Sequence, residues 1–164
     1  MFNLRVVMLG AGIVLSVVPA FSQEPVQKSV DSKGNVGLSV ALSRFQTENF
    51  GVSTSRGLGG WIDVGRGKWT TNVDASVNRD NWVFGVSALR RIEMADRPEV
   101  IHFLFGGGIV SETVANDMTG AIAGGIGMDI PVRRFLTRIQ YRVYCAGADG
   151  PFINQFQAGV GLMF

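Results

Sequence analysis

The sequence predicts an all-β fold: an eight-stranded antiparallel up-and-down transmembrane β-barrel that follows an N-terminal signal peptide. Three observations predict it. Eight segments alternate apolar residues with polar or small ones, and turn residues separate these segments at regular intervals. The last segment ends the chain on an aromatic residue, Phe164. Edge strands of soluble sheets are normally blunted by charge or proline, whereas a closed barrel has no edge, so this ending favours a barrel.

The N-terminus has the pattern of a cleaved secretory signal peptide. Arg5 supplies a positive charge, an apolar run of about 13 residues follows, and small residues precede a cut before Gln23. The run is too short to cross a bilayer of roughly 30 Å as a helix. Because no cysteine follows directly after the cut, a lipid-anchored N-terminus is not expected. We therefore expect a signal peptide (1–22), a short N-terminal segment (23–35) and a barrel domain (36–164).

The composition of the remaining 142 residues excludes several classes of protein. Their number is enough for one domain. The formal net charge of the chain is only +2, so no nucleic-acid partner is expected. Cys145 is the single cysteine and cannot form an internal disulfide. No stretch of 18 apolar residues follows the signal, so no transmembrane helix is expected there.

Three strands are predicted in the first part of the barrel. Asn35–Arg44 alternates Val and Leu with small residues and predicts the first strand. Phe45–Gly57 is rich in Ser, Thr, Gly and Asn and predicts the longest loop. Leu58–Gly65 predicts the second strand, the tetrapeptide 65–68 a tight turn, and Thr70–Asn78 the third strand.

Two more strands are predicted in the middle of the chain. Arg79-Asp80 makes a short connection to the fourth strand, Asn81–Arg90. The polar stretch Arg91–Pro98 predicts a turn, and Glu99–Val110 the fifth strand. Ser111–Asp117 predicts a loop.

The last three strands follow. Met118–Ile130 is rich in small residues and predicts the sixth strand, and Pro131 marks a turn because proline cannot donate within a ladder. Arg134–Ala146 predicts the seventh strand and Gly147–Pro151 the last loop. Asn154–Phe164 is the eighth strand. We expect the loops after the first, third, fifth and seventh strands to face the cell exterior.

The polar face of these strands carries charged residues that a barrel would enclose. The interior of an eight-stranded barrel is just wide enough for side chains to fill it, and a buried charge without a partner would cost several kcal/mol. We therefore predict a lumenal salt-bridge and hydrogen-bond network that plugs the barrel: Asp63, Asp74, Asp129, Arg138, Gln140, Arg142, Tyr144, Gln155 and Gln157. A narrow, gated channel is the alternative. A diffusion porin is not expected, because such channels need about 16 strands.

Motifs in the second half of the chain carry a resemblance to a known family. They are Phe84-Gly85, the stretch His102–Gly107, the stretch Gly124–Asp129, the stretch Arg138–Tyr144 and the strand that ends at Phe164. In this order they resemble the outer membrane protein β-barrel domain family, the small eight-stranded OmpA-like and OmpX-like barrels of the porin family, over about residues 36–164.

The resemblance implies where the protein goes and what it meets. It implies a Gram-negative outer membrane, with membrane lipid and lipopolysaccharide around the barrel. It also implies barrel-assembly machinery and periplasmic chaperones as partners during biogenesis. The assembly machinery would recognise the aromatic-ended last strand, whose matching residues here are Phe156, Val160, Leu162 and Phe164.

An enzyme is not expected. Lipid A deacylases and acyltransferases use small barrels of this kind, and the enzyme alternative depends on His102, the only histidine. The deacylases have a His-x-Ser pattern on the lipid-facing surface, whereas here Phe103-Leu104 follows and the parity of His102 is lumenal. One His and one Cys cannot build a zinc site, and Gly67-Lys68 lacks the phosphate-loop pattern. No catalytic residue, metal or cofactor is therefore predicted.

A soluble lipocalin-like, ligand-binding barrel is the last alternative. It would turn the apolar faces inward and the polar faces to water, and parity alone does not separate the two arrangements. The terminal Phe164 and the pairing of Arg138 and Arg142 with Asp partners favour the membrane barrel. We predict a structural or surface-interaction role, with the loop Phe45–Gly57 the best candidate for contact with an outside partner that the sequence does not identify.

Overall fold

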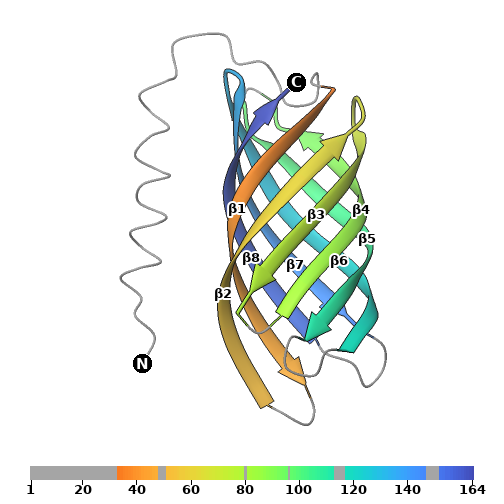
Figure 1. The fold of residues 1–164 in the computed structure, drawn as a ribbon. Helices are drawn as coiled ribbons and strands as arrows, with labels where there is room; N and C mark the ends of the chain where they lie inside the picture. Colours follow the sequence, from red (N-terminus) through yellow and green to blue (C-terminus); the bar gives the residue numbers. More distant parts are fainter. Residues whose placement is uncertain (1–32, 48–50, 80, 96, 113–116, 147–151) are drawn as a thin grey trace.

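The computed structural model describes residues 33–47, 51–79, 81–95, 97–112, 117–146 and 152–164. In these residues the chain forms eight β-strands and no helix (Figure 1). The strands are β1 (Gly34–Thr47), β2 (Gly51–Val64), β3 (Trp69–Asn78), β4 (Asn81–Glu93), β5 (Val100–Glu112), β6 (Asp117–Val132), β7 (Phe135–Cys145) and β8 (Phe152–Met163).

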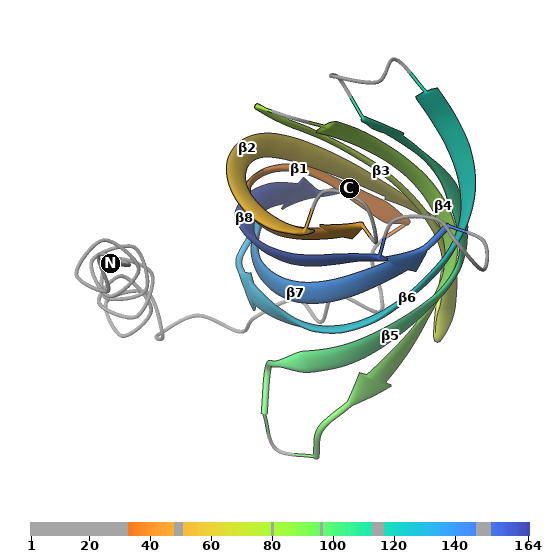
Figure 2. The ribbon, with the colours of Figure 1, turned by 90° about the horizontal axis from the view of Figure 1, so that it is seen from below.

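The strands close into a barrel. Each pairs antiparallel with its neighbour in chain order, and β8 pairs with β1 (Figure 2). At this seam the backbone N–H of Phe164 donates to the carbonyl of Gly34 at 3.0 Å, and the N–H of Lys33 donates to the carbonyl of Phe164 at 2.7 Å. The predicted fold is therefore confirmed in strand number, strand direction and closure.

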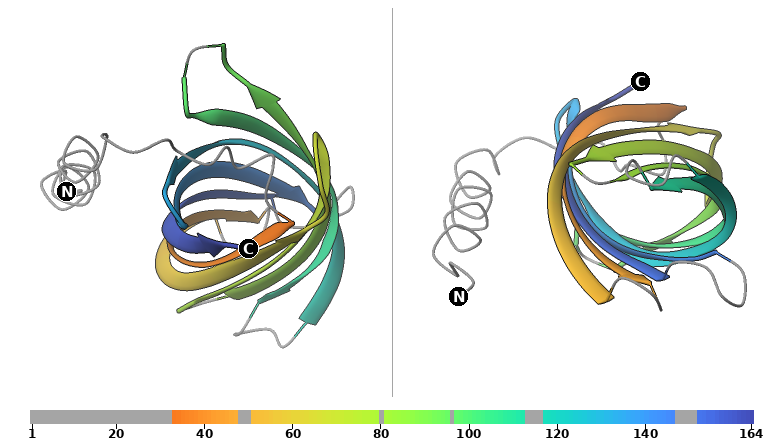
Figure 3. Two further views of the ribbon diagram at one scale, coloured as in Figure 1. Left: turned by 90° about the horizontal axis from the view of Figure 1, so that it is seen from above. Right: turned by 60° about the horizontal axis from the view of Figure 1, so that its bottom comes forward.

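The two ends of the barrel differ. β1 begins and β8 finishes at the same end, which is uppermost in Figure 1 and nearest the viewer in the left panel of Figure 3. We call it the terminus end. At the opposite end β1, β3, β5 and β7 finish and β2, β4, β6 and β8 begin, and we call it the hairpin end.

The barrel is apolar outside and polar inside. Along β3 and β4 nearly every second residue is buried, and the residues between face outward. On β1 and β5 the outward-facing residues include Leu38, Val40 and Phe105, which are 61–76% exposed. A soluble lipocalin-like barrel would show the opposite pattern. An apolar outer wall around a polar interior is the arrangement of barrels that lipid surrounds.

Apolar side chains occupy the interior mainly toward its ends. One cluster lies toward the hairpin end: Phe45, Val83, Val110, Ala123, Tyr144 and Ile153. A smaller cluster lies toward the terminus end: Trp61, Leu136 and Met163. Along β7 the inward side chains between Leu136 and Tyr144 are polar or charged.

The prediction that Phe45–Gly57 forms the longest loop is wrong. β1 continues to Thr47 and β2 begins at Gly51, with these two residues opposite each other, so most of the predicted loop is a two-stranded hairpin. This hairpin reaches lowest in Figure 1. Its described residues alternate as a strand does but most of them are polar or glycine, so a hydrophobic pattern does not reveal the hairpin.

Two predicted turns also lie elsewhere. Pro131 is inside β6, opposite Leu136, and the turn comes at Arg133, whose φ is 56°. A proline near the end of a strand removes only one ladder donor, which the strand tolerates. β4 continues through Glu93, so Arg91 lies in a strand and faces the interior instead of belonging to a turn.

The remaining strand limits differ from the predicted ones by a few residues. The predicted signal peptide (1–22) lies outside the described residues. The same is true of most of the predicted segment 23–35, although Gly34 and Asn35 belong to β1.

Candidate functional site

The interior of the barrel holds a balanced set of charges. Among the residues that the structure describes, the buried charged groups are three carboxylates and three guanidinium groups: Asp63, Asp74, Asp129, Arg91, Arg138 and Arg142. Each of these residues is at most 2% exposed. A buried ion whose partner is removed destabilises a protein strongly, so the equal numbers of the two signs are a condition for this interior to exist.

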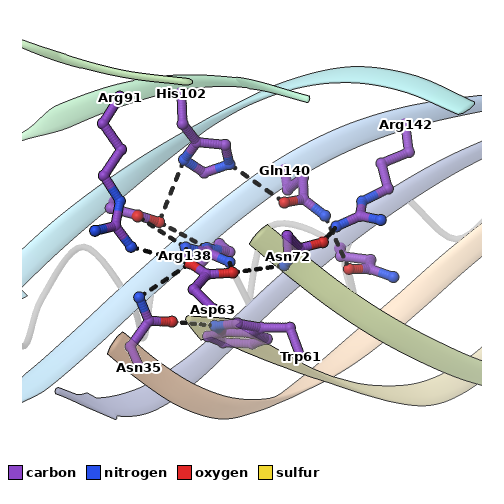
Figure 4. Close-up of polar contacts among 11 residues, drawn as sticks. Asn35, Trp61, Asp63, Asn72, Arg91, His102, Arg138, Gln140 and Arg142 are labelled. Carbon is purple, nitrogen blue, oxygen red and sulfur yellow. Dashed lines mark hydrogen bonds and ion pairs between the residues drawn. The ribbon is translucent and has the colours of Figure 1, made fainter. Parts of the chain in front are cut away.

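Arg138 on β7 lies between two carboxylates (Figure 4). Its Nε and Nη2 donate to the two oxygens of Asp129 at 2.7 and 2.8 Å. Its Nη1 and Nη2 donate to the two oxygens of Asp63 at 3.3 and 2.6 Å. Asp129 is directly opposite Arg138 in the β6–β7 ladder, whereas Asp63 is on β2, which does not pair with β7. Arg138 therefore connects two separate parts of the wall through bidentate pairs, the stronger form of such bonds.

Asp63 is the acceptor for side chains from four strands. Besides Arg138, it receives hydrogen bonds from Arg91 Nη2 at 3.1 Å, Asn35 Nδ2 at 3.0 Å and Asn72 Nδ2 at 2.6 Å. Two cations and two neutral amides thus surround one carboxylate. This arrangement both neutralises the carboxylate and satisfies its lone pairs.

Trp61 supports this cluster from the terminus end. Its indole Nε1 donates to Asn35 Oδ1 at 2.6 Å, and the guanidinium group of Arg138 lies 4.9 Å from the ring centre. Gly37 and Gly159 border the ring: a Cβ atom on either would collide with Trp61. The indole can therefore lie flat beside β1 and β8 only because these two positions have no side chain.

Arg142 forms a second charged cluster with Asp74. Its Nη1 donates to Asp74 Oδ1, and the hydroxyl of Tyr144 donates to Asp74 Oδ2 at 3.0 Å. Its Nη2 donates to Asn72 Oδ1 at 2.5 Å. Because the same Asn72 also donates to Asp63, one amide side chain joins the two charged clusters into a single network.

Three glutamines continue the network toward β8 and β1. Gln155 Nε2 donates to Ser43 Oγ at 3.0 Å and to Ser76 Oγ at 2.7 Å, and Gln157 Nε2 donates to Gln155 Oε1 at 2.7 Å. Gln140 lies beside Arg142. Because a guanidinium group can only donate, the amide oxygen of Gln140 faces Arg142 Nη2 at 3.0 Å.

His102 is part of the same interior and is fully buried. The amide nitrogen of Gln140 donates to its Nε2 at 3.2 Å, and its Nδ1 lies 3.4 Å from Asp129 Oδ1. Neither neighbour carries a hydroxyl or thiol that a histidine base could activate. His102 therefore has the surroundings of a structural side chain.

The structure places all nine predicted lumenal residues inside the barrel, where each is at most 2% exposed. The hydrogen bonds described above bring them together. The prediction missed Asn35, Trp61, Asn72 and Arg91 as members of the network. Parity could have found Trp61 and Asn72, which alternate in phase with the included Asp63 and Asp74. Arg91 was hidden because the predicted fourth strand ended one residue before it.

The four predicted assembly-signal residues lie on the outer wall. Phe156, Val160 and Leu162 belong to β8, and Phe164 follows it at the seam. Their side chains are 44–61% exposed. They share one face of the strand, which points away from the interior network.

Within the described ranges, no group of three or more His, Cys, Asp or Glu side chains could hold a metal ion. The same residues contain no helix long and apolar enough to cross a membrane. The interior carboxylates instead face guanidinium groups.

Solved structures share this architecture. The chain superimposes on Neisserial surface protein A with a TM-score of 0.70, covering 81% of this chain and 98% of that one at 14% identity. It superimposes on Ail, the attachment invasion locus protein of Yersinia pestis, with a TM-score of 0.62, covering 82% and 99% at 16% identity. The chain has the fold of the small outer-membrane barrels.

The same fold occurs in the N-terminal β-barrel domain of Pseudomonas aeruginosa OprF, with a TM-score of 0.60 and 12% identity over 82% of this chain and 100% of that domain. No protein-family model and no curated protein sequence matches the chain. The predicted resemblance to small eight-stranded outer-membrane barrels is confirmed at the level of the fold.

Proposed function

We propose that this chain is a small integral outer-membrane barrel protein with a structural or surface-interaction role, a lumen plugged by its own side chains, and no enzymatic activity. It would be exported by its signal peptide and inserted through its last strand. The observation that carries the proposal is the inverted barrel, with apolar side chains outside and a joined polar network inside.

The interior network supports a closed lumen. Arg138 and Asp63 are joined across the interior by a bidentate pair, and Arg142 holds Asp74 and Asn72 one level further along the axis. An open path for ions would require these bonds to separate. Breaking a buried ion pair costs about 3–5 kcal/mol, so an open state would be rare.

The β1–β2 hairpin supports a role at the surface. Its residues Gly51–Arg56 pair with β1, whereas the described pairs between β2 and β3 begin only at Gly57. This stretch of β2 therefore has one edge whose backbone groups can pair with an extended segment of another protein. In an outer membrane the hairpin end would face the cell exterior, where such barrels carry their longer loops.

The architecture is tested with the refolded protein in lipid vesicles. We expect flotation with the vesicles, a band on SDS gels that migrates differently before and after heating, and no conductance across planar bilayers. A detergent-free soluble monomer would contradict the membrane proposal. Conductance that Arg142→Ala alters would contradict the plugged lumen and establish the narrow channel.

The role is tested with a trimmed hairpin. Replacing residues 46–52 by Asn-Gly would join Phe45 to Ser53, which already face each other, through a two-residue turn. In cells that lack the chain, we expect full-length protein to restore surface adhesion and the trimmed variant to insert equally well without restoring it. Full restoration of adhesion by the trimmed variant would contradict a surface-interaction role for the hairpin and favour the structural role. Altered lipid A on overexpression, measured by mass spectrometry, would contradict the absence of enzymatic activity.

A further inference from the structure

The outer wall carries a group of polar side chains close to the hairpin end, on neighbouring strands from β7 through β8, β1 and β2 to the end of β3. We call it the outer basic patch: Arg44, Thr54, Arg56, Arg79, Tyr141 and Asn154. From the patch toward the terminus end the wall is apolar, because Val40, Leu58 and Val77 face outward and are 61–71% exposed. The patch therefore borders this apolar wall on the side that faces the hairpin end.

The strand register shows how the patch is arranged on the wall. One lateral row across the wall consists of Tyr141, Phe156, Leu42 and Arg56, each opposite the next. The next outward-facing row toward the hairpin end consists of Val143, Asn154, Arg44 and Thr54, and three of its four residues are polar. Aromatic side chains form girdles where such barrels meet the membrane interface. Tyr141 and Phe156 thus place the arginines at the depth of lipid headgroups.

The side chains of the patch line two open grooves. One groove is lined by Thr54, Ser55, Arg56 and Arg79. The other has an apolar part, Leu42, Val52 and Phe156, and a polar part, Arg44, Thr54, Tyr141 and Asn154. The hydroxyl of Tyr141 donates to Asn154 Oδ1, which orders the polar part. The second groove offers an amphiphile both a charged and an apolar surface.

The charges of the patch have one sign. Among the described residues, no carboxylate lines either groove, and no ion pair engages Arg44, Arg56 or Arg79. Like charges on adjacent strands repel each other. An anion shared between the arginines would remove this repulsion, and guanidinium groups bind phosphate oxygens in a bidentate manner.

We propose that the outer basic patch binds the phosphorylated headgroup of a membrane lipid, lipopolysaccharide in an outer leaflet, while an acyl chain of the same lipid packs on Leu42 and Phe156. This inference rests on the proposed membrane location. The arginines alone would suit any phosphate. The apolar part of the groove, continuous with the apolar wall, selects a lipid instead of a free anion.

The test measures retention of lipid by purified barrel in detergent, using native mass spectrometry with bisphosphorylated lipid A as the probe. We expect each of Arg44→Gln, Arg56→Gln and Arg79→Gln to weaken binding on the order of tenfold, as loss of a charge-assisted hydrogen bond does. Arg66→Gln is the control, because Arg66 is exposed in the turn at the terminus end. A variant that combines the three substitutions, the triple variant, should bind intact lipid A weakly. Wild type should bind dephosphorylated lipid A equally weakly.

Three results would overturn the inference. They are unchanged binding by the triple variant, an equal loss in Arg66→Gln, and displacement of the lipid by millimolar inorganic phosphate, which would indicate a site for a free anion. Heat-dependent gel migration checks that each variant is folded. A folded, membrane-inserted barrel that retains no lipid contradicts this inference alone, whereas failure of wild type to insert contradicts the proposed function.

Discussion

At the scale of single residues, the interior depends on Arg138. It bonds both Asp63 and Asp129 and lies over the ring of Trp61. Sequence parity predicted that Arg138 faces inward, with Asp residues as its partners, without naming the pairs. Parity could not predict that Arg138 pairs with Asp63, because the two residues are 75 positions apart and lie on strands that share no ladder.

Arg138→Met should lower the free energy of unfolding in detergent by about 3–5 kcal/mol, because it leaves buried carboxylates without their main partner. Urea titration followed by tryptophan fluorescence measures the change. Arg97→Met is the matched control, since Arg97 is exposed in the β4–β5 turn, and it should cost less than about 0.5 kcal/mol. Similar losses in both variants would show that the interior pairs contribute nothing to stability.

Trp61→Phe should cost less than Arg138→Met. The phenyl ring keeps an aromatic face for Arg138, but Asn35 Oδ1 loses its indole donor. One buried acceptor without a partner costs about 1–3 kcal/mol. Near-UV circular dichroism is a fitting measurement, because it does not depend on the fluorophore removed. A cost as large as that of Arg138→Met would mean that the indole mainly serves to pack the terminus end.

At the scale of elements, the seam between β8 and β1 closes the barrel. Gly159 lies opposite Ser39 in this seam, and a Cβ atom there would collide with the backbone carbonyl of Leu38 and approach Trp61 Cζ3 to 2.7 Å. The sequence predicted that these two strands pair. It did not predict how closely they approach, since that depends on the indole enclosed between them.

Gly159→Ala should therefore destabilise the barrel by about 1–3 kcal/mol, as overpacking of a filled interior does. Gly120→Ala is its control, because a Cβ atom at Gly120 would meet nothing within 4 Å. The two variants are compared by the urea concentration at half unfolding. Equal midpoints would show that the seam accommodates the added methyl group at position 159, against this expectation.

The β1–β2 hairpin is the element that sequence reasoning missed. Its alternation is preserved, but its residues beyond the apolar wall have little contrast between the two faces. Hydrophobic periodicity detects a strand through such contrast. A strand with mainly polar residues on both faces is therefore predicted as a loop. The backbone ladder, from Arg44↔Thr54 to Thr47↔Gly51, is what identifies it as a hairpin.

At the scale of the whole molecule, the last strand must both close the barrel and, as we propose, direct its assembly. Phe164 and Phe135 allow the two roles to be separated. Both lie on the outer wall at the terminus end, and they are 57% and 61% exposed. Their contributions to lipid contact should therefore be nearly equal.

Phe164→Ala should reduce the amount of barrel in the outer membrane of cells, whereas Phe135→Ala should leave it close to wild type, because Phe164 belongs to the proposed assembly signal and Phe135 does not. Membrane fractionation with immunoblotting measures the amounts. Both variants should refold alike in detergent, where no assembly machinery acts. An equal decrease in the amount of the two variants in the outer membrane would show that Phe164 acts only as an aromatic side chain at the membrane interface.

The sequence by itself determined eight alternating strands, their order and direction, and which residues share a face, because side-chain alternation is a local property of an extended chain. The tertiary structure decided which face is enclosed, since closure alone assigns inside and outside. It also decided which charges meet: the partners of Asp63 come from four strands, and only the closed ring brings them within hydrogen-bonding distance. The final Phe164, a local feature, became part of a seam only through its bonds to Gly34.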